Sequence, residues 1–128
     1  MDAAQALADL TEISSQVEAA VLFDETGAVT ASTLADDRGA AELARAAAAL
    51  LERAESLGSG ESEVTQVEAS TAEGSVFVVR DGARRIAATT APDPTTGLVF
   101  YDLKSCLRGS APEAKPKRKR AAKDAGEA

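Results

Sequence analysis

The sequence contains no histidine, no tryptophan and no asparagine, and it contains a single cysteine. Without histidine, the chain lacks both the usual general base near neutral pH and the commonest zinc ligand. We expect Cys106 to be a partly buried small hydrophobe near a helix end, the alternatives being an intermolecular bridge or a reactive thiol. A serine–lysine pair formed by Lys104 and Ser105 would be too exposed to act as nucleophile and base. These absences favour a protein that is not an enzyme and that uses no metal and no cofactor.

Long hydrophobic runs are also missing, although 45% of the residues are hydrophobic. No run approaches the roughly 18–20 apolar residues that a transmembrane helix needs. The first ten residues carry acidic side chains and no basic ones, so they do not resemble a secretory signal. We therefore expect a cytoplasmic protein whose 128 residues form one domain around one core.

Basic residues are scarce in most of the chain and concentrated at its C-terminal end. Residues 1–108 contain 8 Lys and Arg against 18 Asp and Glu, a net charge of −10, and residues 109–128 contain 6 against 3, a net charge of +3. We expect the domain to span 1–108 and the basic tail, 109–128, to be disordered. The run KPKRKR in this tail suits an anionic membrane, a nucleic acid, the acidic body of the protein itself, or a merely solubilising role.

Hydrophobic periodicity in the first third of the chain predicts a helix and a pair of strands. Apolar residues on one face predict the helix over residues 2–14. Alternating residues predict strands over 17–24 and 28–33, joined by a turn in which Gly27 takes a positive φ. Both faces of the first strand are apolar, which predicts that both are covered. One face is assigned Val17, Ala19, Val21 and Phe23.

The segment 37–57 is predicted to be a long helix, capped by Asp36 or Asp37 and ended by Gly58. Its apolar residues recur at steps of three and four and form a broad stripe that must pack on a sheet. Further alanines leave its second face lined with small side chains. That face indicates a surface for another protein, or it reflects only the high helix propensity of alanine.

The second half of the chain predicts three strands and a last helix. The segment 63–70 alternates polar and apolar residues, as expected of a strand at the edge of a sheet. A strongly apolar strand follows, the Asp81–Gly82 turn leads into another, and Pro92 ends it. The last helix is expected from residue 95 or 96 to 107. The order is therefore α-β-β-α-β-β-β-α. It gives an α+β fold in which the long helix covers one face of a five-stranded antiparallel sheet and the terminal helices cover the other.

Four stretches carry a resemblance to a known family: VEAAVLFDETGAVTAST, the Ala- and Leu-rich helix after it, EGSVFVVRDGARRIAATT and PTTGLVFYDLKSCLR. In their order and spacing, over residues 1–108, they resemble the Roadblock family (dynein light chain roadblock type) in its bacterial MglB-like branch. The resemblance implies a Roadblock/profilin-like fold and a non-catalytic homodimer. It also implies that the chain binds a small Ras-like GTPase through its long helix and modulates its nucleotide cycle.

Members of this family pair through an exposed edge strand and the long helix. Carried over to this chain, the resemblance implies a dimer interface that includes Val64, Gln66, Glu68, Ala47 and Leu50. It implies a partner-binding face that includes Arg38, Glu42, Arg45, Ala49 and Arg53. An unpaired edge strand agrees with this reading, because its free backbone groups favour pairing with another chain.

Two alternatives stay open at this stage. The arginines of the long helix are either a source of an arginine finger for the GTPase or solvated partners of Glu42, Glu52 and Glu55. The same fold also suits a scaffold or sensory adaptor that binds a kinase, a cytoskeletal protein or a small ligand.

Overall fold

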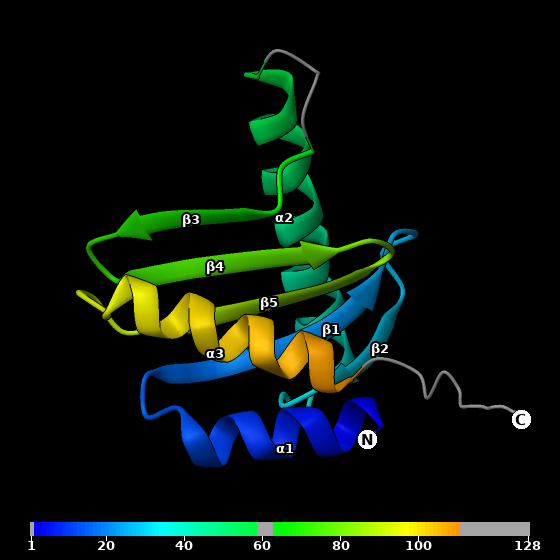
Figure 1. Cartoon of the computed structure of the whole chain (residues 1–128), viewed down its shortest axis with the longest axis vertical. Coiled ribbons are helices and arrows are strands. Elements are labelled where there is room, and N and C mark those ends of the chain that lie inside the picture. Colours follow the sequence, from blue (N-terminus) through cyan, green and yellow to red (C-terminus); the bar gives the residue numbers. More distant parts are fainter. Residues whose placement is uncertain (1, 59–62, 111–128) are drawn as a thin grey trace, which may run out of the picture.

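A computed structural model describes residues 2–58 and 63–110 of the chain (Figure 1). Its elements are α1 (Ala3–Ile13), β1 (Val17–Asp24), β2 (Val29–Ser32), α2 (Asp37–Ser56), β3 (Gln66–Thr71), β4 (Gly74–Asp81), β5 (Arg84–Thr90) and α3 (Thr96–Gly109). The order and type of these elements confirm the prediction. Helix α3 runs through Gly109, so it extends past the expected domain boundary at residue 108. The basic tail predicted to be disordered, 109–128, lies outside the described residues from position 111 onward.

The five strands form one antiparallel sheet in the order β2-β1-β5-β4-β3. Strands β2 and β3 are therefore its two edges, and the edge position predicted for the third strand is confirmed. Strand β3 begins at Gln66 rather than at Glu63. The preceding carbonyl of Thr65 still accepts a hydrogen bond from the Arg80 backbone N–H of β4, at 2.9 Å.

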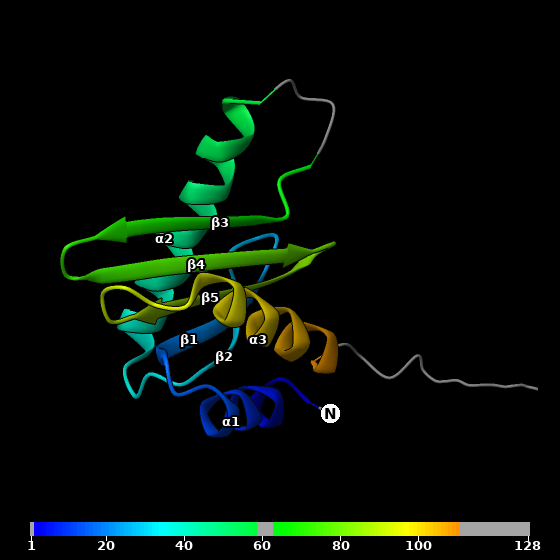
Figure 2. The same cartoon turned by 60° about the vertical axis from the view of Figure 1, so that its left-hand side comes forward.

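The helices cover the sheet in two layers, as predicted. Helices α1 and α3 lie side by side on one face, and α2 crosses the other face (Figures 1 and 2). Each face has its own buried core. The core under α1 and α3 contains Leu7, Leu10, Leu22, Phe77, Ile86 and Leu103. The core under α2 contains Val21, Phe23, Ala40, Ala44, Ala47, Leu51, Val78 and Ala87.

One face assignment in β1 is wrong. Val17 packs against the core under α1 and α3, whereas Val21 and Phe23 belong to the core under α2. The cause is a bulge, because Val17 and Ala19 pair with consecutive residues of β5 and leave Glu18 as an extra residue. An extra residue reverses the side to which every preceding side chain points.

Local sequence explains how α2 is placed. The side chain of Asp36 caps the helix by accepting a hydrogen bond from the Arg38 backbone N–H at 3.0 Å, which satisfies one of the free donors of the first turn. Alanines at 40, 44 and 47 meet the sheet and are at most 2% exposed. Their small size allows the helix axis to lie close to the strands.

Candidate interaction site

The edge strand β3 is open on the side away from β4. Among the described residues it pairs with β4 alone, over six positions from Gln66 to Thr71. Its residues alternate between the two faces of the sheet. Val67 packs on the core under α2, whereas Glu68 lies opposite Phe77 on the face that α3 covers. Backbone groups along such an edge can extend the ladder to another strand.

Helix α2 carries a stripe of exposed side chains on the side opposite its buried stripe, and we call it the outer stripe. It consists of Arg38, Glu42, Arg45, Ala49 and Arg53. These are the predicted partner-binding residues, and the structure brings all five to one side of one helix. Their contact with a partner stays a prediction.

Two glutamates of α2 form ion pairs among the described residues. Arg38 pairs with Glu42 at 3.8 Å, and both side chains are largely exposed, so this pair adds little stability. Glu55 pairs instead with Arg80 of β4. Within the described residues, no ion pair joins Arg45 or Arg53 to Glu42, Glu52 or Glu55.

The predicted dimer residues divide into two groups. Gln66 is exposed, and Glu68, Val64 and Leu50 are half-buried, so all four have surface to offer. Ala47 is 0% exposed and packs inside the protomer against its own sheet. Its assignment to a surface between two copies is wrong, because its position in the helical repeat points it at β1, β4 and β5.

The C-terminal turns of α2 extend past the β3 edge (Figures 1 and 2). Leu57, at the end of this overhang, is 87% exposed. Arg80 ties the overhang to the sheet through its pair with Glu55, and it also contacts Glu63, in the segment before β3, at 3.9 Å. Its hydrogen bond is the main reason why the pKa of the Glu55 carboxyl lies below its ordinary value.

A polar hollow of about 510 Å³ lies beside the outer stripe, between α2, the β1–β2 turn and the β4–β5 hairpin. Its lining residues are Phe23, Asp24, Glu25, Arg45, Ala48, Ala49, Leu51, Glu52, Glu55, Arg80 and Arg85. The hollow thus joins three arginines with four carboxylates. Such a mixed surface can pair with both signs of charge on a protein partner.

Sequence reasoning missed the contribution of the sheet to this hollow. Arg80 and Arg85 face each other across the β4–β5 hairpin. The Asp81–Gly82 turn signal fixes this pairing and could have revealed it. Asp24 is held by hydrogen bonds from the Thr26 hydroxyl, at 2.5 Å, and from the Thr26 and Ala28 backbone N–H groups. These bonds, that of the Thr26 hydroxyl first, lower the pKa of Asp24.

Two observations concern metal binding and the thiol of Cys106 in the described residues. They hold no group of three or more His, Cys, Asp or Glu residues placed to bind a metal ion. Cys106 is buried as predicted, and burial raises the pKa of its thiol to about 11, which leaves little of the nucleophilic thiolate near neutral pH. No helix in the described ranges has both the length and the apolar character needed to cross a membrane.

Comparisons with known proteins point to one family. The family described as Roadblock/LC7 domain matches residues 3–91. The fold resembles a Roadblock/LC7 domain from Streptomyces avermitilis, with a TM-score of 0.76, 18% identity, and coverage of 85% of this chain and 94% of that one. It also resembles the gliding protein mglB from Thermus thermophilus, with a TM-score of 0.63, 20% identity, and coverage of 84% of each chain.

A further similar structure is described as MglB with tetrameric arrangement. It has a TM-score of 0.60 and 21% identity, and the alignment covers 83% of this chain and 85% of that one. No curated protein matches the chain. At these identities, the likeness of this chain to the solved structures is one of fold.

Proposed function

Because this chain belongs to the Roadblock/LC7 family, we propose that it is a homodimeric, non-catalytic regulator of a small Ras-like GTPase in the cytoplasm. The observation that carries the proposal is the combination of an open β3 edge with an exposed, arginine-bearing outer stripe on α2. The edge supplies a surface for a second copy. The stripe supplies a surface for the GTPase.

In the proposed dimer, β3 of one copy pairs with β3 of the other, so that two five-stranded sheets become one. The backbone groups along both edges are then hydrogen-bonded, which is the usual gain of strand addition. The α2 overhang of each copy reaches across the edge toward the other copy. Apolar surface of Leu57, and of the half-buried side chain of Leu50, is then removed from water.

The GTPase contact is proposed on the outer stripe and the adjoining hollow. Arg45 belongs to both the outer stripe and the lining of the hollow, so we assign it a central place in the proposed contact. Ala49, beside it, leaves room for close approach of a partner's backbone. The regulator acts by reshaping the switch loops of the GTPase or by placing a guanidinium near its phosphates.

A nucleotide-dependent titration tests the proposal. The full chain is titrated with the small GTPases encoded in the same genome, each loaded with GDP or with a non-hydrolysable GTP analogue. We expect binding in one nucleotide state, and Arg45→Glu to weaken it by about tenfold or more, as for a central charged contact. Arg108→Glu, which reverses an exposed charge on the α3 side of the sheet, is the matched control and should leave affinity unchanged.

Two outcomes of this titration would contradict the proposal. Equal affinity of the Arg45→Glu and Arg108→Glu variants would remove the outer stripe from the GTPase contact. Stable capture of a kinase or a cytoskeletal protein, with no dependence on nucleotide, would assign the chain to the scaffold class instead.

A further inference from the structure

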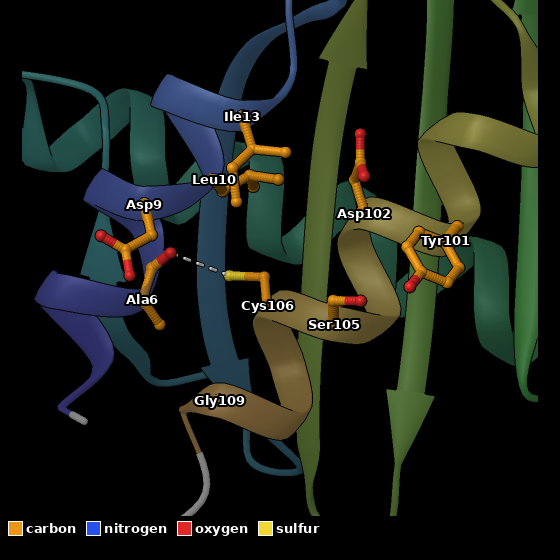
Figure 3. A pocket seen from close by; sticks show the side chains of 9 residues that line it. All are labelled: Ala6, Asp9, Leu10, Ile13, Tyr101, Asp102, Ser105, Cys106 and Gly109. Atoms are coloured by element: carbon orange, nitrogen blue, oxygen red, sulfur yellow. Dashed lines mark hydrogen bonds between the residues drawn. The ribbon is translucent and has the colours of Figure 1, made fainter.

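An apolar groove of about 310 Å³ lies between α1 and α3, on the face of the sheet away from α2 (Figure 3). It is lined by Ala6, Asp9, Leu10, Ile13, Tyr101, Asp102, Ser105, Cys106 and Gly109, and we call it the α1–α3 groove. Two of its apolar side chains are strongly exposed, Ile13 at 72% and Tyr101 at 64%. Neither the β3 edge nor the outer stripe contributes to this groove.

Two carboxylates stand on opposite walls of the groove. Asp9 comes from α1 and accepts a hydrogen bond from the Gln5 side chain at 3.0 Å, and Asp102 comes from α3 and is 8% exposed. No Lys or Arg side chain in residues 2–58 and 63–110 forms an ion pair with either. Lys104 and Arg108 line a separate hollow toward β4, although Arg108 also donates to Ser105 at 3.5 Å.

We propose that the α1–α3 groove is the docking site of this chain's own basic segment, residues 111–128. The described structure ends at Ser110, and the preceding Gly109 is itself part of the groove wall. The segment contains six Lys and Arg and carries a net charge of +3, whereas residues 1–108 carry −10. The charge difference favours contact of the segment with the acidic domain, and its starting point beside Gly109 favours this groove.

The segment is long enough to reach the whole groove. From Gly109 back to Tyr101, helix α3 rises about 12 Å at 1.5 Å per residue. The five residues 111–115 span about 17 Å when extended. The KPKRKR run, 115–120, can therefore lie anywhere along the groove, beside either carboxylate.

The side chains of this run match the mixed character of the groove. Lys and Arg cover apolar surface with their methylene stems and place their charged heads at its polar points. Stems over Leu10 and Ile13 would bring cations to Asp9 and Asp102. The exposed ring of Tyr101 offers a face for a cation as well.

The sequence supplies a built-in probe for the test. Tyr101 is the single tyrosine and the chain has no tryptophan, so its fluorescence reports on the groove alone. Quenching of the full chain by acrylamide, a neutral quencher, measures how far Tyr101 is covered. We expect weak quenching at low salt and stronger quenching at 1 M NaCl, where charge pairing is screened.

Two variants and one control make the test specific. Replacing Lys117, Arg118, Lys119 and Arg120 by Gln at full chain length should give strong quenching at both salt concentrations. Asp9→Asn, which keeps an acceptor for Gln5, should shift the ratio of docked to free tail by about two- to fivefold, as for one exposed ion pair. Glu42→Gln, on the outer stripe of α2, should behave as the wild type. Circular dichroism checks that each variant keeps the fold.

The proposal is overturned if neutralising the tail leaves Tyr101 quenching unchanged at low salt. If the wild-type chain, whose Tyr101 is then not covered by the tail, binds phosphatidylserine vesicles, the tail is assigned to anionic membranes. The proposal is also overturned if the protection of Tyr101 disappears on dilution, because a second copy would then be supplying the cations.

Discussion

The seating of α2 on the sheet gives the sharpest stability prediction, because two alanines two residues apart face opposite ways. Ala47 is 0% exposed and packs on the core that contains Val21, Val78 and Ala87, whereas Ala49 lies on the exposed outer stripe. Ala47→Leu places three additional carbon atoms in this buried core. Ala49→Leu adds the same atoms in open solvent.

We expect Ala47→Leu to lower the free energy of unfolding by about 1–3 kcal/mol, the usual cost of overpacking a core. Ala49→Leu should change it by less than about 0.5 kcal/mol, because Leu and Ala have similar helix propensities and the site is exposed. In a domain of this size the loss corresponds to a drop in Tm of roughly 4–8 °C per kcal/mol.

Urea unfolding followed by circular dichroism measures both values, at one fixed protein concentration because dimerisation would shift the midpoint. If the two variants unfold at the same urea concentration, the buried stripe of α2 is misassigned. In the GTPase titration the order should reverse. Ala49→Leu, on the outer stripe, should weaken GTPase binding more than Ala47→Leu.

Three further predictions concern a glycine, a thiol and an ion pair. Gly74 has φ of +152°, and an added Cβ would overlap a backbone carbonyl of β5, so Gly74→Ala should destabilise the fold by more than about 2 kcal/mol in urea unfolding. Because burial raises the pKa of the Cys106 thiol from 9.0 to about 11, stability should be full below pH 9 and fall as the pH rises from there toward 11. Cys106→Ala should remove that loss in pH-dependent unfolding. The pKa of Glu55 is lowered by Arg80, so this pair stabilises the fold above the ordinary value of 4.5 and is lost as the pH falls through the lowered pKa. Glu55→Gln should flatten this acid limb and Glu52→Gln should not; equal acid limbs would contradict the pairing.

The architecture was predictable because local signals agreed with one another. Apolar periods of two and 3.6 located the strands and helices, Asp36 marked the start of α2, and the Asp81–Gly82 turn fixed the β4–β5 hairpin. The bulge at Glu18 was not predictable, because it exists only through the pairing of β1 with β5, some seventy residues away.

The placement of the candidate interaction site was predictable in part for a similar reason. A helical period suffices to collect Arg45 and its neighbours on one stripe. Ala47 was misassigned because the family resemblance placed it in the dimer interface, whereas its step of three from Ala44 puts it on the buried stripe of α2. The pairing of Arg80 with Glu55 and the α1–α3 groove depend on how separate elements pack, which no local pattern encodes.

Sedimentation equilibrium of the full chain at micromolar concentration measures whether a second copy closes the β3 edge. We expect a particle of twice the chain mass of 13.1 kDa. A single folded species of 13.1 kDa at that concentration would contradict it.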